Sequence, residues 1–375
     1  MSSALIHLNA LPSALSSRAP RRAVLISALA AGCCAIAAPV AAQDATPEAS
    51  AVPEAKVPVG TPAPRRGQVT IYSGRSENLV GPWFVLFDHE SGITTEVRYA
   101  GTAELAATLL EEGENSPASA FFAQDAGALG LLAQEGLFQP LPQEILDRVP
   151  ERFRAADGTW VGVTGRARVL VYNTDLLSDD QLPMSVLDLT DPAWKGKVGW
   201  APENASFQSF ITGMRLLIGD DATLQWLEAM IANDTVNFGD SNAAIVQAVA
   251  NGEVAVGLVN HYYLVAAQRE AGGKLPIANH HFAPEDPGSL INVAGIGVLA
   301  NAPDPDAALE VVEALLDDES QEYFVEQTGE YAVVEGIEAP HDLKPIEETA
   351  SPAVDLAGLS DLNATLEMLA EVGLL

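Results

Sequence analysis

Short apolar segments with the pattern of strands alternate along most of this chain with segments in which apolar residues have helical spacing. This alternation constrains the fold more than any other feature, because it is typical of α/β proteins with largely parallel sheets. The chain has 375 residues, more than one core usually spans, so we expect two lobes. The predicted strands are 69–72, 94–99, 118–123, 160–172 (crossing a break at Gly165-Arg166), 197–202, 254–259 and 290–299. The predicted helices are 77–89, 102–112, 126–135, one that follows residue 206, 222–231, 242–250, 264–271, 305–316 continuing to 326, and one carried by Leu362, Leu366 and Leu369.

The first 42 residues have the pattern of an export signal. Arg21 and Arg22 precede an uncharged, alanine-rich run, residues 23–42, and a signal peptidase could cut after the small residues that end at Ala42. A rival boundary lies before Cys33, where the sequence is similar to a weak lipoprotein box. Both cysteines of the chain lie in this region, so disulfides and thiol catalysis are excluded from the folded body. We therefore expect an exported, periplasmic or otherwise extracytoplasmic protein, either free or lipid-anchored through Cys33.

Residues 43–66 are rich in proline, alanine and threonine, and we expect them to form a disordered linker. No later apolar run has the length of a membrane span.

The charge of the chain excludes one class of partner. The formal net charge is -32, from 51 acidic and 19 basic residues. Binding to nucleic acid needs clustered lysine and arginine, so nucleic acid is excluded as a partner. We interpret the acidic balance as a solvated surface, since net charge bears on solubility more than on a particular site.

Two adjacent tyrosines, Tyr262 and Tyr263, stand where the apolar run 254–259 ends and a helical pattern begins. At such a turn two neighbouring phenols can converge on one point. Phenolates are hard oxygen donors that suit a hard cation such as Fe(III), and a bound cation can deprotonate its own ligands. Ordinary packing of both rings against the core is the alternative for this dipeptide taken alone.

Three turns fall where a predicted strand ends and a predicted helix starts: Gly74-Arg75-Ser76, Gln124-Asp125 and Asn204-Ala205-Ser206. In open α/β sheets the ligand crevice lies at the carboxyl ends of the strands. Helix N-termini present free N–H groups to an anion. These turns and the tyrosine pair are therefore expected to face one cleft, although each turn taken alone is also explained by helix capping.

Several segments together resemble the ferric-ion-binding proteins of bacterial iron ABC importers. They are VTIYSGR at 69–75, SPASAFF at 116–122, GRARVLVYN at 165–173, WKGKVG at 194–199, and the stretch 247–263. The resemblance covers about residues 68 to 340. It implies a two-lobed type II periplasmic-binding-protein fold, α/β, with hinge crossovers between mixed sheets. It assigns 67–168 plus 292–345 to the first lobe and 169–291 plus 346–375 to the second.

The resemblance also implies a function. The chain would be the extracytoplasmic substrate-binding subunit of an importer, a monomer that binds Fe(III) with a synergistic anion in the cleft and performs no chemistry. It would deliver the iron to an ABC permease and its ATPase in the inner membrane.

Site residues follow from the same resemblance. Tyr262 and Tyr263 would be phenolate ligands from the second lobe. The turn Asn204-Ala205-Ser206 would hold the anion, carbonate or phosphate, and Arg75 and Arg166 would neutralise it, because an arginine fork matches an oxyanion.

The chain departs from the family pattern at three places. Ser76 replaces the histidine that some members carry in the first lobe, and Gln124, followed by Asp125, replaces a glutamate. No third tyrosine stands near residues 204–207. The candidate protein ligands are therefore Tyr262 and Tyr263, with Asp125 and Gln124 as further candidates. The anion must complete the coordination shell of the metal ion. The ring of His261 is expected to point away from Tyr262, as a polar wall residue.

Two other functions compete with iron binding. In the first, the same cleft captures an oxyanion or a small organic anion, and the tyrosines are only its walls. The second is a secreted hydrolase, which the sequence disfavours because it contains no nucleophile elbow and no His-Glu-x-x-His motif.

Overall fold

The computed structural model describes residues 61–339, 343, 345, 346, 349, 351, 352 and 354–375. All of them belong to one compact unit that spans residues 49–375. The predicted export signal with Cys33, and residues 43–60 of the predicted linker, lie outside the described residues; residues 61–66 form no helix or strand. In this part of the chain no helix combines the length and hydropathy needed to span a membrane.

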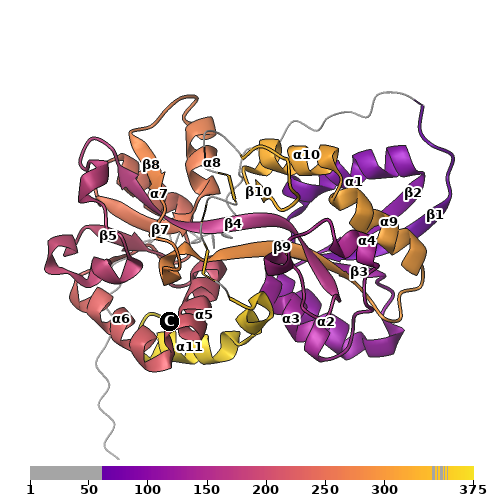
Figure 1. Cartoon of the computed structure of the whole chain (residues 1–375), viewed down its shortest axis with the longest axis horizontal. Coiled ribbons are helices and arrows are strands. Elements are labelled where there is room, and N and C mark those ends of the chain that lie inside the picture. The colour runs from indigo at the N-terminus through magenta and orange to yellow at the C-terminus, as the bar shows by residue number, and fades with distance from the viewer. Residues whose placement is uncertain (1–60, 340–342, 344, 347–348, 350, 353) are drawn as a thin grey trace, which may run out of the picture. The chain divides into compact units, whose positions relative to one another are not determined.

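The first half of the chain, together with strand β9 from later in the chain, forms a mixed sheet flanked by helices (Figure 1). Three parallel strands, in the order β2-β1-β3, are followed by β9, which pairs antiparallel with both β3 and β4. The predicted alternation of strands and helices is confirmed here. The elements are β1 (Gly67–Ser73), α1 (Glu77–Ser91), β2 (Ile93–Tyr99), α2 (Thr102–Glu112), β3 (Ala120–Ala123), α3 (Ala126–Gln134), α4 (Gln143–Leu146), β4 (Trp160–Asn173) and β9 (Ile291–Val298).

The second half continues the sheet beyond β4 in the order β7-β5-β6, and β8 also pairs with β4. Strands β7, β5 and β6 are parallel to one another, and β7 and β8 are antiparallel to β4. Strands β6 and β8 were not expected from the sequence. The elements are β5 (Val198–Trp200), α5 (Ala205–Ile218), α6 (Asp220–Ala232), β6 (Val236–Asn237), α7 (Asn242–Ala250), β7 (Val256–Asn260), α8 (Tyr262–Glu270) and β8 (Ile277–His280).

Strand β4 belongs to both halves of the sheet. Its residues 160–167 pair with β9, and its residues 168–172 pair with β7 (Figure 1). The expected break at Gly165-Arg166 is wrong: β4 is continuous, and its pairing is irregular instead between Gly162 and Thr164. Gly165 takes part in strand pairing on both sides of β4, with Val293 on one side and Tyr331 on the other.

The remaining elements close the fold. The helix expected over residues 305–326 is divided in two, because the Asp317 side chain accepts a hydrogen bond from the Ser320 N–H (2.7 Å) and caps a new helix. The elements are α9 (Pro305–Leu315), α10 (Asp318–Thr328), β10 (Tyr331–Ala332) and α11 (Leu362–Glu371). Short 3-10 turns are Gly113–Asn115, Glu151–Phe153, Asp179–Gln181, Val186–Thr190, Pro192–Trp194, Pro287–Ser289 and Leu356–Ser360.

The apolar core has separate parts, and successive segments of β4 contribute to different ones. Residues of β4 up to Ala167 pack into a first core with β1, β3, β9 and α1. From Val169 onward, alternate residues enter two clusters on opposite faces of the sheet, as the two-residue period of a strand requires. Leu170 packs with α5 and α6, and Val169 packs with α7 and α8; we call both clusters together the second core. Leu356 and Leu359 belong to the first core and Leu369 to the second.

Candidate metal and anion site

Tyr262 and Tyr263 are the first two residues of α8, immediately after β7 and the linking residue His261. Their rings stack, with centroids 4.6 Å apart and ring planes 28° from parallel. Asn260, the last residue of β7, places its Nδ2 3.5 Å from the Tyr262 hydroxyl. The strand-to-helix transition therefore puts the two predicted ligands side by side.

Arg168 of β4 lies beside these phenols, and its side chain is 4% exposed. Nη1 donates to Ser206 Oγ (3.3 Å) and Asn260 Oδ1 (3.2 Å), and the guanidinium lies 5.2 Å from the centre of the Phe210 ring. Within the described part of the chain, Nε and Nη2 of Arg168 are buried without a hydrogen-bond partner. Such donors are rare in folded proteins and call for an explanation.

The charge of Arg168 is perturbed by its surroundings. Burial lowers the pKa of Arg168 to about 10, and the phenols of Tyr262 and Tyr263 act in the opposite direction. Arg168 therefore remains a cation at neutral pH. An anion in contact with its two unpaired N–H groups would satisfy both the charge and the donors.

Ser206 connects this arginine to helix α5. Asn204 caps α5, and its Oδ1 accepts from the Ser206 N–H (2.9 Å) and the Ser206 hydroxyl (2.6 Å). The same hydroxyl oxygen accepts from Arg168 and from Asn242 Nδ2, each at 3.3 Å. Ala205 is exposed at the start of the helix. The predicted anion turn thus lies next to Arg168.

The Tyr263 hydroxyl is held in its protonated form. The neighbouring Tyr262 phenol, and then burial, raise the pKa of Tyr263 above its usual range, while Asn242 and Arg168 act to lower it. A cation bound to the oxygen would reverse this preference, because a metal ion is the largest local charge in its site.

Arg75 and Arg166 meet at one carboxylate. Glu330 is 3% exposed, and its oxygens accept from Arg75 Nη1 (2.9 Å) and Nη2 (2.7 Å) and from the Thr164 hydroxyl (2.9 Å). Arg166 Nε lies 3.9 Å from the same carboxylate. Burial alone would raise the pKa of Glu330, but Arg75 and Arg166 outweigh it and bring the pKa to about 2.

The two first-half candidates are used locally. The Asp125 carboxylate caps α3 by accepting from the N–H groups of Gly127 (3.1 Å) and Ala128 (3.3 Å). The backbone carbonyl of Gln124, not its side-chain amide, accepts from Arg166 Nη2. No hydrogen bond among the described residues joins Gln124 or Asp125 to the tyrosines.

His261 is fully buried, and its ring lies edge-on to Tyr262 with centroids 5.7 Å apart. The Ala167 N–H donates to Nδ1 (3.2 Å), and Nε2 lies 2.9 Å from the Gly329 carbonyl oxygen. Burial lowers the pKa of His261 to about 4, so the ring is neutral. Its nitrogens are directed to backbone groups of Ala167 and Gly329, and its ring contacts Tyr262 instead of pointing away from it.

A small cavity of about 10 Å³ lies where the two cores meet. This is roughly the space that one water molecule needs. Its lining residues are Arg166, Arg168, Ser206, Ser209, Phe210, Asn260, Leu290 and Asn292.

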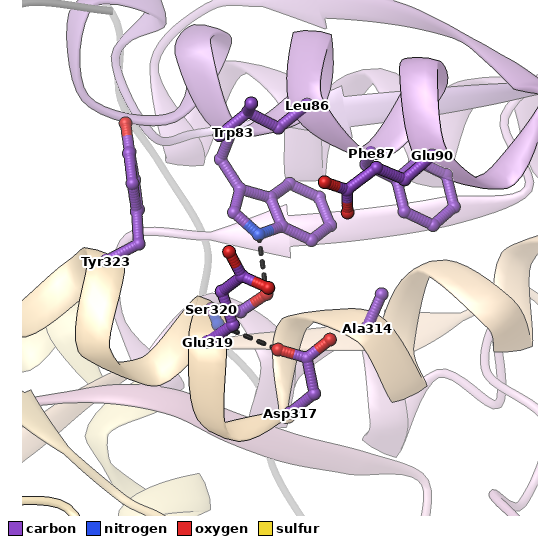
Figure 2. Close-up of a pocket in the computed structure, with 9 residues that line it drawn as sticks. All are labelled: Trp83, Leu86, Phe87, Glu90, Ala314, Asp317, Glu319, Ser320 and Tyr323. Carbon is purple, nitrogen blue, oxygen red and sulfur yellow. Dashed lines mark hydrogen bonds between the residues drawn. The ribbon is translucent and has the colours of Figure 1, made fainter. Parts of the chain in front are cut away.

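Another hollow lies between α1 and α10 in the first core (Figure 2). Trp83 Nε1 donates to Ser320 Oγ (2.8 Å) on its floor, and Asp317 is engaged in capping α10. None of the predicted site residues lines it. Among the described residues no group of three or more His, Cys, Asp or Glu side chains could hold a metal ion.

Comparison with known proteins gives the family. Residues 84–352 match the family described as bacterial extracellular solute-binding protein. The chain belongs to this family. As a bacterial extracellular solute-binding protein it binds and releases a solute, which confirms the expectation that it is not an enzyme.

Relatives of this solute-binding protein carry names that refer to iron. It is 35% identical over 309 residues to the Fe(3+)-binding periplasmic protein of Serratia marcescens, covering 82% of this chain and 90% of that protein. Its structure is similar to that of iron-bound HitA from Pseudomonas aeruginosa, with a TM-score of 0.74, 32% identity, and 82% and 100% of the two chains covered. It is also similar to a Trichodesmium protein in complex with iron and citrate, with a TM-score of 0.71, 26% identity and the same coverage. The predicted two-lobed type II fold and the family resemblance are confirmed.

Four residues of this arrangement were missed from the sequence as site residues: Arg168, Asn242, Asn260 and Glu330. A signal for Arg168 was present. Arg166 and Arg168 are two apart on a fully buried strand, so both side chains point to one face. Two arginines on one buried face need anionic partners. The sequence around Asn242 and Glu330 gives no comparable indication, because these residues belong to elements that are distant in the sequence and reach the site only in the folded protein.

Proposed function

We propose that this protein is the extracytoplasmic substrate-binding subunit of a bacterial ABC importer, and that it carries Fe(III). The observation that supports this most directly is the stacked pair Tyr262 and Tyr263 beside the buried, partly unpaired cation Arg168. The names of its relatives support the same cargo. Delivery to a permease and its ATPase in the inner membrane, a monomeric state and export to the periplasm belong to the same proposal.

Electrostatics require an anion in this site. Fe(III) bound by two phenolates still carries a positive charge, and Arg168 adds a second positive charge in a region of low dielectric. An anion between the metal ion and the guanidinium removes this repulsion and fills the remaining coordination positions. Carbonate or phosphate fits, since each offers oxygens to both the metal ion and the unpaired N–H groups of Arg168.

The other predicted residues take different parts in this proposal. Ser206 and Asn260, which both accept from Arg168, hold its guanidinium toward the anion, and Asn204 fixes Ser206. Arg166 lines the cavity and adds positive charge there.

The remaining three candidates have local partners. Arg75 holds Glu330, Asp125 caps α3, and the Gln124 carbonyl accepts from Arg166. A contribution of Arg75 to the anion or of Asp125 to the metal ion therefore depends on a change of conformation, whereas the contact of Gln124 leaves its side-chain amide unused.

The unpaired N–H groups of Arg168 also favour a second function, the capture of an oxyanion or small organic anion without a metal ion. In that case the tyrosines form only the wall of the cleft.

One experiment separates the two functions. Fe(III) is supplied to the purified protein from a weak chelator, with bicarbonate or with phosphate, and the visible tyrosinate-to-iron charge-transfer band is recorded. We expect a band in the wild type and none in Tyr262→Phe/Tyr263→Phe. Tyr172→Phe is the control, because that hydroxyl is bound to Asp179 (2.7 Å) away from the site.

A wild type that stays colourless with every anion would exclude iron, and calorimetric titration with the anions alone would then test the second function. An unchanged band in the double variant would refute the assignment of the tyrosines.

A further inference from the structure

Helix α8, which carries the tyrosines, is fastened at its start to the segment that joins α10 to β10. We call residues 326–331 the α10–β10 segment. His261 lies between that segment and β4, with Nδ1 facing the Ala167 N–H and Nε2 facing the Gly329 carbonyl. The side chain is fully buried, so neither contact is exchanged with water.

These two contacts determine which ring nitrogen of His261 carries the proton. A backbone N–H can only donate, so Nδ1 accepts from Ala167. In a neutral imidazole the other nitrogen must then carry the hydrogen, and Nε2 donates to Gly329. The hydrogen bond to one nitrogen of a histidine ring fixes both its tautomer and its orientation.

The ring is also packed tightly on both sides. It stacks on Tyr331, with centroids 4.4 Å apart, and meets Tyr262 edge-on. Gly329 has a φ of 72°, and a Cβ there would lie 3.3 Å from Val265 and 3.6 Å from the Tyr262 Cβ. Glycine at this position therefore lets the segment approach the first turn of α8.

The far end of α8 contacts the same segment. Arg269 donates to the carbonyl oxygens of Gln327 (2.9 Å) and Glu326 near the C-terminal end of α10. Such contacts suit a cation, because the last carbonyls of a helix form the negative end of its dipole. Both ends of α8 are thus fixed on the α10–β10 segment.

We propose that His261 is a positioning residue of the iron site, which holds the Tyr262 phenol in place by fixing the first turn of α8 on the Gly329 carbonyl. This inference rests on the proposed function, since it concerns the geometry of a tyrosine-bound metal ion. Residues that orient metal ligands typically change metal affinity by about 10- to 100-fold when substituted.

Two polar substitutions separate the two hydrogen bonds of His261. In His261→Gln the side-chain amide reaches the position of Nε2 and keeps the bond to Gly329. In His261→Asn the shorter amide reaches only the position of Nδ1, so it keeps the bond to Ala167 and loses the one to Gly329. His280→Asn is the control, because it removes a similar contact, from His280 Nε2 to the Pro183 carbonyl (2.8 Å), elsewhere in the second half.

The measurements are the wavelength and intensity of the charge-transfer band per bound iron at saturation, and the rate of iron release to a strong chelator. We expect His261→Asn to shift the band and to release iron about 10- to 100-fold faster, and His261→Gln to stay near the wild type. A band at saturation reports ligand geometry, so a loss of overall stability alone would leave it unchanged.

Equal behaviour of the Asn and Gln variants, or an Asn variant like the wild type, would overturn the inference. If His261→Asn does not fold, Gly329→Ala decides, because a Cβ at that position would lie 3.3 Å from Val265 and would displace the Gly329 carbonyl from the first turn of α8. Faster iron release than in the wild type is expected there, and an unchanged rate would refute the inference. A wild type without any band refutes the proposed function instead.

Discussion

The position of Arg168 favours ligand binding and lowers the stability of the ligand-free protein. Its Nε and Nη2 are buried and unpaired, and its positive charge lies in the apolar surroundings of Phe210. Each buried donor without a partner costs about 1–3 kcal/mol of stability, so the arginine is explained by a ligand rather than by the fold. Stability and affinity should therefore respond in opposite directions to its removal.

Substitution Arg168→Met tests this at the level of one residue. Methionine keeps contact with Phe210 and has no N–H group to leave unpaired, so the anion-free variant should gain about 1–3 kcal/mol in free energy of unfolding. Stabilisation of the wild type by bicarbonate or phosphate should be absent from the variant, since only a bound ligand raises stability by mass action. Urea unfolding with and without each anion measures both effects.

Arg152→Met is a suitable control, because Arg152 packs 4.5 Å from the Phe153 ring but is exposed. A loss of stability in Arg168→Met comparable to a buried hydrogen-bond deletion would show that Arg168 is structural.

Sequence reasoning predicted local features of the candidate site and missed contacts that depend on tertiary structure. The position of Tyr262 and Tyr263 between a strand and a helix was predicted, because the end of the strand and the start of the helix are visible in the sequence. Arg75 was expected to face an anion, and the structure supplies that anion as Glu330, 255 residues away along the chain. No periodicity or motif links two positions so distant.

At the level of elements, most strands and helices were predictable because apolar periodicity and caps are local signals. The strands missed were β6, β8 and β10, which have only two to four residues. Such strands form because a neighbouring strand offers free N–H and C=O groups. Here β8 and β10 pair with β4, so their existence depends on β4 and not on their own residues.

The packing of α7 on β7 matters for the site because α7 begins with Asn242, which contacts Ser206. Gly257 of β7 makes this packing close: a Cβ there would lie 2.2 Å from Ile245 Cγ2. Gly257→Ala should therefore lower the free energy of unfolding by about 1–3 kcal/mol, as overpacking does, and weaken anion binding by displacing α7.

Gly273→Ala is the matched control, because a Cβ at residue 273 has no heavy atom within 4 Å. Thermal unfolding and calorimetric titration with phosphate measure the two effects. A Gly257→Ala variant as stable as the control would mean that α7 adjusts without cost.

On the scale of the whole molecule, Glu330 joins distant parts of the chain. It follows α10, and it binds Arg75 after β1, Thr164 of β4 and, at 3.9 Å, Arg166. Removal of one partner of a buried ion pair typically costs about 3–5 kcal/mol, because the remaining charge stays buried and uncompensated. Glu330→Gln should lower stability at pH 7 by that order, and Glu322→Gln, an exposed position on α10, should not.

The same carboxylate predicts a pH dependence. The pKa of Glu330 is about 2 in the folded protein against an ordinary value of 4.5, so the folded state favours the ionised form. Its contribution to stability is fully present above pH 4.5 and is lost as the pH falls toward 2. Unfolding measured from pH 7 to pH 2 should show a steeper loss of stability in the wild type than in Glu330→Gln. Parallel curves would contradict the role of Glu330.

Because β4 pairs with strands in both halves of the sheet, its length is more strictly constrained than that of a loop or a surface helix. The side chains of a strand alternate between faces, so a register shift of one residue exchanges buried and exposed positions. A single-residue insertion near Ala167 would leave the pairing in one half of the sheet intact and invert every side chain of β4 in the other half, turning Arg168 away from Asn260. Only insertions or deletions of two residues would preserve the alternation of side chains in this strand. Among homologous chains, single-residue insertions or deletions should therefore be rarer in β4 than in other parts of the chain.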